Sequence, residues 1–95
     1  MAETAVFLAD GFEEVEAITP IDFLRRAGIT VHIVGVRRQV VKGGHDLVVQ
    51  AETLIDDLNV DLDAVIFPGG KTGAENLAAS DAVTSLIHDT YIKGN

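Results

Sequence analysis

Three short apolar runs, at residues 4–8, 29–35 and 63–67, constrain the fold of this chain more than any other feature. They have the length and apolar character of buried strands, and the second is rich in β-branched residues. Residues 13–28, between the first two runs, have acidic residues in the first turn of a helix and arginines in the last. This order predicts a right-handed β-α-β unit in an open parallel α/β sheet, with both faces covered.

A hairpin is predicted after the second strand. Residues 40–42 and 47–49 are short apolar runs that flank a glycine turn, which is typical of two antiparallel strands outside the main sheet. Residues 51–58 are ambiguous, although Asp56 and its neighbour favour a short helical turn. Beyond the hairpin, no strand or helix is predicted with defined bounds for residues 51–58.

The last third of the chain is predicted to be mostly helical. Residues 68–73 form a glycine-rich turn, followed by a short helix at 74–79 and a longer one at 81–92. In open α/β sheets a helix of this kind leads into another strand, but only three main strands precede Asn95. We therefore expect residues 1–95 to be the N-terminal portion of a single domain, completed by a second chain or by further residues.

Composition and charge argue against several classes of protein. A chain with 47% hydrophobic residues is not expected to be disordered, and a net charge of -8 disfavours binding to nucleic acid. No apolar run approaches the ~20 residues that span a bilayer, and the acidic N-terminus is unlike a signal peptide, so we expect a soluble cytoplasmic protein. The chain has no cysteine, and hence no disulfide and no thiol nucleophile.

One carboxylate of the predicted helix, Glu16, differs from its neighbours. Glu13 and Glu14 are predicted to be solvated charges, but Glu16 shares a helical strip with three apolar residues. From the spacing alone, the simpler interpretation of Glu16 is a partly exposed carboxylate that pairs with a nearby arginine. The apolar residues of the strip are Pro20, Phe23 and Ala27.

Two residues are expected to interrupt or end this helix. Pro20 lies within it, where proline removes a hydrogen bond and clashes with the preceding turn. We therefore expect a kink there, or a restart capped by Thr19. Gly28 is a typical helix-terminating residue, and Arg25 and Arg26 before it are expected to pair with carboxylates or to be solvated.

Two stretches, residues 10–16 and 68–76, lie at the carboxyl ends of predicted strands, where open α/β sheets bind ligands. Their residues resemble the ThiJ/PfpI family in a composite pattern that extends over essentially all 95 residues. This resemblance implies a flavodoxin-like three-layer sandwich with a parallel sheet, of which the chain is the N-terminal half. The matching positions are Gly11 to Glu16, Pro20, Asp22, Arg25 to Gly28, Pro68 to Gly70, Gly73, Ala74, Asn76 and Leu77.

The resemblance also implies a cysteine-dependent site that extends beyond this chain. Glu16 matches the helix glutamate that contacts the family's nucleophilic cysteine, and Gly70, beside Gly69, matches the backbone amide of its oxyanion hole. The cysteine and its histidine partner are expected after Asn95. A thiolate is stabilised by nearby donors, and preorganised amides suit a developing oxyanion. No metal or organic cofactor is implied.

Further positions are implied to contact substrate or a second subunit. Gly69 and His45 are expected near substrate, because the turn that carries His45 comes close to the partner's active site in the family. Val15 and Ile18 lie on the helix edge that forms a dimer interface in the family. Without the resemblance, Gly69 and Gly70 form an ordinary turn, His45 is a solvated turn residue, and the two apolar residues belong to the core.

The implied function is that of a glyoxalase or protein deglycase, a hydrolase or lyase that acts on reactive carbonyls such as methylglyoxal. The expected partners are the second half of the domain, a second copy of the protein and the carbonyl substrate. The family leaves open a redox sensor or chaperone with the same oxidisable cysteine, and a PfpI-type peptidase. A receiver domain is disfavoured, because Pro68 and Gly69 stand where its phospho-acceptor aspartate is expected.

Overall fold

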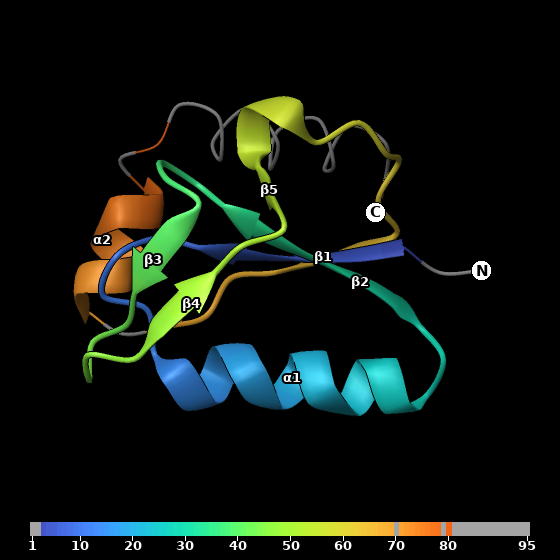
Figure 1. Cartoon of the computed structure of the whole chain (residues 1–95), viewed down its shortest axis with the longest axis horizontal. Helices are drawn as coiled ribbons and strands as arrows, with labels where there is room; N and C mark the ends of the chain where they lie inside the picture. The colour runs from blue at the N-terminus through green and yellow to red at the C-terminus, as the bar shows by residue number, and fades with distance from the viewer. Residues whose placement is uncertain (1–2, 70, 79, 81–95) are drawn as a thin grey trace.

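The computed structural model of the chain describes residues 3–69, 71–78 and 80. Within them, strands and helices alternate as predicted, and Figure 1 shows their arrangement. The predicted helix at residues 81–92 lies outside the described residues. In chain order the elements are β1 (Glu3–Leu8), α1 (Glu14–Arg26), β2 (Thr30–Gly35), β3 (Val40–Lys42), β4 (Val48–Gln50), β5 (Thr53–Leu54), the 3₁₀ helix η1 (Ile55–Asp57), β6 (Ala64–Ile66) and α2 (Lys71–Ala78).

Four strands form a parallel sheet in the order β5-β2-β1-β6. The central strand β1 pairs with β2 along its whole length and with β6 on its other side. Strands β3 and β4 form a separate antiparallel pair, so the predicted hairpin is confirmed. The ambiguous segment contributes a fourth strand, β5, which pairs with β2 only at Val34 and Gly35. A strand of two residues is too short to show a hydrophobic period in the sequence.

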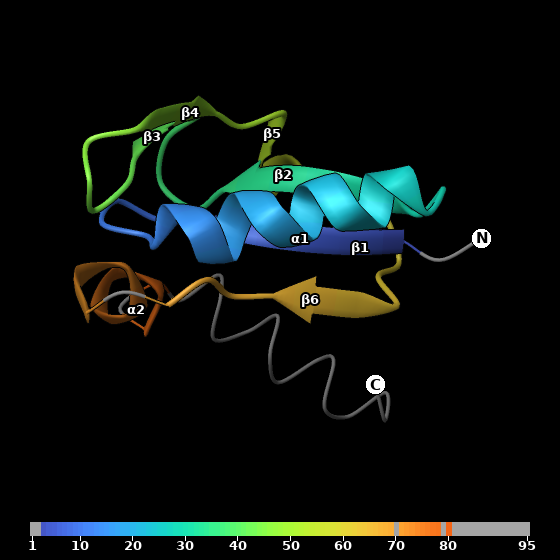
Figure 2. The ribbon, with the colours of Figure 1, turned by 90° about the horizontal axis from the view of Figure 1, so that it is seen from below.

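Each face of the sheet buries its own apolar cluster, because side chains alternate along a strand. Val6 and Leu8 of β1 point to the face covered by α1 and the hairpin, whereas Ala5 and Phe7 point to the opposite face. Figures 1 and 2 show α1 along one side of the sheet, with η1 on the other side. This layering is that of the expected flavodoxin-like fold. The first cluster also contains Phe12, Ala17, Ile21, Val31 and Val41, and the second Ala9, Val34, Val36 and Leu77.

Helix α1 is continuous through Pro20, so the predicted restart with a Thr19 cap is wrong. The helix begins instead at an N-cap residue, Glu13, whose side chain accepts a weak hydrogen bond from a backbone N–H of the first turn at 3.4 Å. Ala17 and Ile21 are buried on either side of the proline. Packing of an apolar face provides most of a helix's stability in a protein, which offsets the hydrogen bond that proline removes.

The last turn of α1 is held by ion pairs. Arg25 lies 3.1 Å from the carboxylate of Glu52, and Arg26 lies 3.0 Å from that of Asp22. Gly28 follows with a φ of 81°, in the left-handed region that glycine adopts without strain. The predicted pairing of the two arginines and the predicted end of the helix are both confirmed.

Helix α2 begins at Lys71, three residues earlier than predicted. Gly73 lies inside this helix, at a place where an added Cβ would lie 2.7 Å from Cα of Phe12. A glycine inside the helix lets its backbone approach the turn after β1. The glycines of residues 68–73 predicted a loop, but Gly73 lies inside α2 and allows the helix to pack closely. None of the helices described here combines the length and apolarity that crossing a membrane requires.

Candidate functional site

The carboxyl ends of β1 and β6 lie side by side, and the chain leaves them toward opposite faces of the sheet. Helix α1 follows β1 on the face of the hairpin, whereas α2 follows β6 on the other face, where Leu77 joins the core. In open α/β sheets, ligands bind beyond the carboxyl ends of two neighbouring strands whose connections lie on opposite faces of the sheet. The two stretches predicted to form a site therefore meet at the expected edge.

Glu16 and Gly69 are in direct contact at this edge. The N–H of Gly69 donates to Oε1 of Glu16 at 2.7 Å, and its carbonyl accepts from the N–H of Glu13 at 3.0 Å. An added Cβ at Gly69 would lie 2.6 Å from Oε1, so a glycine is needed for this approach. Glu16 is exposed, and within the described part of the chain its Oε2 has no hydrogen-bond partner. Among the described residues, one carboxylate oxygen is thus held and the other has no hydrogen-bond partner.

The turn between β1 and α1 is bonded to the surrounding segments. The N–H of Gly11 donates to the carbonyl of Lys42 in the hairpin at 2.8 Å, and its carbonyl accepts from the N–H of Gly73 in α2 at 3.2 Å. Nδ2 of Asn76, also in α2, donates to the carbonyl of Asp10 at 2.6 Å. The hairpin, α2 and the turn after β6 therefore all fix the backbone at the start of α1.

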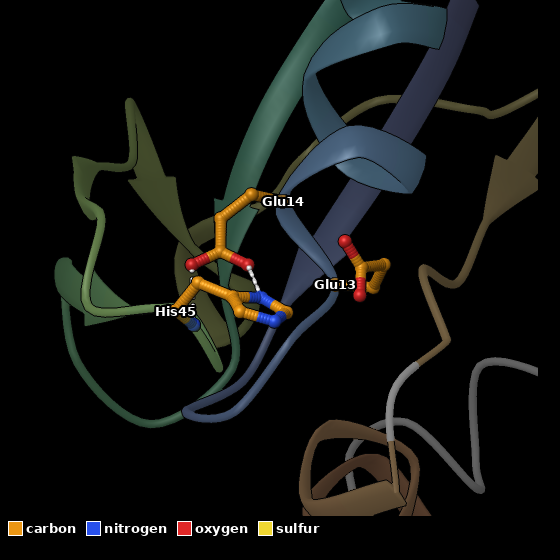
Figure 3. A group of neighbouring side chains, drawn as sticks. All are labelled: Glu13, Glu14 and His45. Carbon is orange, nitrogen blue, oxygen red and sulfur yellow. Dashed lines mark hydrogen bonds and ion pairs between the residues drawn. The ribbon is translucent and has the colours of Figure 1, made fainter.

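A second glutamate of α1, Glu14, is buried, with 4% of its surface exposed. One carboxylate oxygen, Oε2, accepts the backbone N–H groups of His45 at 2.7 Å and of Leu47 at 3.4 Å. The other, Oε1, lies 3.0 Å from Nδ1 of His45, as Figure 3 shows. The prediction that Glu14 is a solvated charge is wrong. Its position on the helix, three and seven residues before buried Ala17 and Ile21, turns it toward the hairpin.

These contacts shift the pKa values of both partners. Burial by itself raises the pKa of Glu14, but hydrogen bonds from the His45 side chain and from backbone amides outweigh it and lower the pKa to about 2. The hydrogen bond to Glu14 raises the pKa of His45, as do the charges of Glu14, Glu13 and Asp46, while burial opposes the shift. The pair therefore favours the ionised carboxylate and the imidazolium.

Glu13, Glu14 and His45 are also the one group of at least three side chains, within the described residues, whose atoms are close enough to share a cation. Their potential ligand atoms lie within 4.8 Å of one another. However, both oxygens of Glu14 already have N–H groups beside them. The cluster is therefore explained as an internal ion pair, and we assign no metal to it.

An open hollow of about 550 Å³ lies between the turn after β1 and the hairpin. Its wall includes both acidic and basic side chains, but these pair with one another: Arg38 lies 3.7 Å from Asp10, and Lys42 lies 3.3 Å from Asp46. Glu16 does not line this hollow. Each charged side chain in the wall of the hollow is therefore already paired and is not available to a ligand. The candidate site is instead the edge of the sheet at Glu16.

The structure brings together only some of the predicted site residues. Glu16 and Gly69 are in contact, whereas His45 is bound to Glu14 on the side of α1 that faces the hairpin. Gly70 lies outside the described residues. The proposed chemical roles of all four of these predicted positions remain predictions.

The expected dimer residues, Val15 and Ile18, are 67% and 41% exposed, so the alternative that they belong to the core is wrong. Phe23, on the strip of Glu16, is 66% exposed as well. The strip that distinguishes Glu16 in the sequence is therefore not the face that packs on the sheet. Sequence reasoning missed Glu14, although its spacing from Ala17 and Ile21 was a signal that could have identified it.

Comparison with known proteins gives a consistent result. The model of the DJ-1/PfpI family matches residues 2–95. The Parkinson disease protein 7 homolog of Danio rerio is 36% identical over 87 residues, which are 88% of this chain and 46% of that protein. Deglycase PfpI of Pyrococcus furiosus is 29% identical over 87 residues, which are 90% of this chain and 52% of that protein.

The fold has close counterparts among solved structures. The crystal structure of a cysteine-to-alanine mutant of a DJ-1 superfamily protein from Salmonella typhimurium superimposes with a TM-score of 0.96 at 37% identity. The match covers 100% of this chain and 52% of that one. The chain thus spans about half the length of the relatives it matches.

Proposed function

Because the chain belongs to the DJ-1/PfpI family, we propose that it is the N-terminal half of a cysteine-dependent enzyme that acts on small reactive carbonyls. The substrate class comprises methylglyoxal and its adducts on proteins, and one relative is itself named a deglycase. The observation that carries the proposal is the contact of Glu16 with Gly69, which holds one carboxylate oxygen at the carboxyl edge of the sheet, while the other oxygen has no partner among the described residues. No metal or organic cofactor is needed for the chemistry below.

The open oxygen of Glu16 suits proton transfer with a thiol supplied by the second half. In the proposed reaction, the cysteine sulfur adds to the aldehyde carbon of methylglyoxal, and the thiol proton ends on the carbonyl oxygen. A proton then moves from that carbon to its neighbour, and the hydroxyl proton passes to the neighbouring carbonyl oxygen, which gives the thioester of lactate. Water hydrolyses this thioester to lactate and the free thiol. A carboxylate beside the sulfur can hold the proton between these steps.

The turn after β6 would supply the oxyanion donor. The N–H of Gly69 is occupied by Glu16, so this amide is used to shape the turn. We propose that the next amide, that of Gly70, faces the oxyanion, and that Gly69 serves the substrate site by holding the turn in place. A preorganised backbone donor of this kind stabilises charge that develops in the transition state.

The proposed partners are the second half of the domain and a second copy of the protein. Within the described residues, β6 has a strand neighbour only on its β1 side, which leaves an edge for a further strand. The exposure of Val15 and Ile18 supports a place for this edge of α1 in a homodimer. We propose that His45 lines the substrate site of the partner subunit in that dimer.

The experiment is to measure lactate release from methylglyoxal by the complete protein and by its Glu16→Gln variant. The amide keeps the size of the side chain but cannot exchange the proton, so turnover should fall by about 10²-fold while the melting temperature is retained. Unchanged turnover in the variant would refute the role of Glu16. A complete wild-type protein that is oxidised by peroxide, yet releases no lactate, would support a redox sensor instead.

A further inference from the structure

The contact between Glu14 and the β3–β4 turn combines a buried carboxylate with three hydrogen bonds. The carboxylate is 6% exposed and receives two backbone N–H groups and one imidazole nitrogen from the turn. A buried charge is costly unless it is paired and hydrogen-bonded, and here the turn provides all of its partners. The turn is thus built around this one side chain.

Close packing fixes the position of the turn on the helix. An added Cβ at Gly43 would lie 2.5 Å from the Glu14 carboxylate, so the turn backbone passes directly over it. The N–H of Gly44 donates to the carbonyl of Phe12 at 2.8 Å, and Asp46 has a φ of 70°. The residue between them, His45, is therefore held at a defined place next to the first turn of α1, as Figure 3 shows.

The same contact determines which nitrogen of His45 carries the proton. A carboxylate only accepts hydrogen bonds, so Nδ1 beside it must be the donor. The neutral imidazole then has its lone pair at Nε2, and the imidazolium has a second N–H there. The side chain of His45 is 75% exposed, so Nε2 is accessible to a ligand.

The charges around His45 favour the imidazolium. Glu13 and Glu14 face it from α1, and Asp46 faces it from the turn, where Lys42 pairs with Asp46 at 3.3 Å. The three carboxylates raise the pKa of His45. In the imidazolium the exposed Nε2 is a hydrogen-bond donor, which suits an oxygen acceptor such as a carbonyl or a hydroxyl group.

We propose that Glu14 is a positioning residue for His45: it fixes the turn through two backbone N–H groups and holds the imidazole by its Nδ1–H, and so directs Nε2 toward the substrate, where the imidazolium donates to a substrate oxygen. This inference rests on the proposed function, in which His45 lines a site for a carbonyl substrate. Glu14 itself contacts no substrate and acts only through the histidine.

Nitrogen-15 NMR of the histidine side chains in the complete protein tests the positioning directly. In the wild type, neutral His45 should carry its proton on Nδ1. In Glu14→Gln, the amide oxygen can still accept the two backbone N–H groups while the NH₂ group faces Nδ1, so the proton should move to Nε2 and the pKa should fall toward its ordinary value of 6.5. The matched control, Glu13→Gln, removes a charge of the same turn but should leave the proton on Nδ1.

Two outcomes would overturn the inference. One is a neutral wild-type His45 with its proton on Nε2, which needs no variant and so remains decisive if Glu14→Gln does not fold. The other is a folded Glu14→Gln protein in which the protonated nitrogen and the pKa of His45 are unchanged.

Kinetics provide the functional arm of the test. His45→Gln should raise KM for methylglyoxal several-fold with a smaller change in kcat, because the lost contact is with bound substrate. Glu14→Gln should raise KM less, because its neutral imidazole still carries an N–H at Nε2. An unchanged KM in His45→Gln would refute the substrate contact. A complete protein without turnover would refute the proposed function, while the NMR result would still decide whether Glu14 positions His45.

Discussion

Glu14 and Glu16 are two residues apart in the first turn of α1, yet their surroundings differ in almost every respect. Glu14 is buried, and both of its oxygens have partners in the hairpin turn. Glu16 is exposed, and of its two oxygens only Oε1 has a partner in the part of the chain that the structure describes, the N–H of Gly69. A carboxylate fully occupied by its neighbours thus stabilises structure, whereas one with a spare oxygen is available for chemistry.

Both glutamates also lie against a glycine, which provides a matched pair of substitutions. An added Cβ would lie 2.5 Å from the Glu14 carboxylate at Gly43 and 2.6 Å from that of Glu16 at Gly69. The two clashes are almost equal, but only Glu16 has solvent into which it can move. The same change, glycine to alanine, should therefore have different consequences at the two sites.

The largest effect on stability is expected for Gly43→Ala. Glu14 cannot move away without breaking its buried hydrogen bonds, so the complete protein should lose roughly 1–3 kcal/mol in free energy of unfolding. Chemical denaturation measures this loss. The control is Gly44→Ala, whose added Cβ would meet its nearest atom, the carbonyl oxygen of Gly11, at an ordinary 3.4 Å. Equal losses at the two glycines would show that Glu14 is not a rigid neighbour.

A smaller effect, on catalysis instead of stability, is expected for Gly69→Ala. The exposed Glu16 should swing away from the new methyl group, so the free energy of unfolding should change by less than about 1 kcal/mol. Turnover should fall about tenfold, because the carboxylate loses its position. The double variant with Glu16→Gln should be no slower than Glu16→Gln alone, since both changes act on one group. If the two losses of turnover were additive, Gly69 would act independently of Glu16.

The smallest effect is the pH dependence of stability that arises from the Glu14 and His45 pair. The pKa of Glu14 is lowered from 4.5 to about 2, so its contribution is complete above 4.5 and is lost as pH falls through that range. The pKa of His45 is raised, so its contribution is complete below 6.5 and is lost as pH rises through the raised value. In melting curves from pH 2 to 9, His45→Gln should remove the alkaline decline and reduce the acid decline, because the His45 side chain helps to lower the pKa of Glu14. An alkaline decline of equal size in the variant would assign that decline to other groups.

The sheet could be predicted from the sequence because its strands are encoded locally. Apolar runs at residues 4–8 and 29–35 became β1 and β2, and the glycine turn predicted the hairpin of β3 and β4. The composite of short motifs also indicated the family. These features depend on residues that are neighbours in the chain, which is the information that a sequence displays directly.

Three features could not be predicted in this way, for different physical reasons. Strand β5 is two residues long and exists because β2 offers an edge beside it. Gly73 lies inside α2, where its backbone packs against Phe12 in the turn after β1. The burial of Glu14 depends on a turn that begins about 30 residues later in the chain and contributes three donors to the buried carboxylate.

The fold class, the family and the presence of an unusual glutamate in the first half of the domain can thus be predicted from the order of residues alone. The folded chain was needed to show that α1 contains two such glutamates in opposite surroundings, one facing the hairpin and one facing the turn after β6. The reason is that the helix determines the direction in which each side chain points, whereas the hydrogen-bond donors that the side chain contacts belong to segments far away in the sequence.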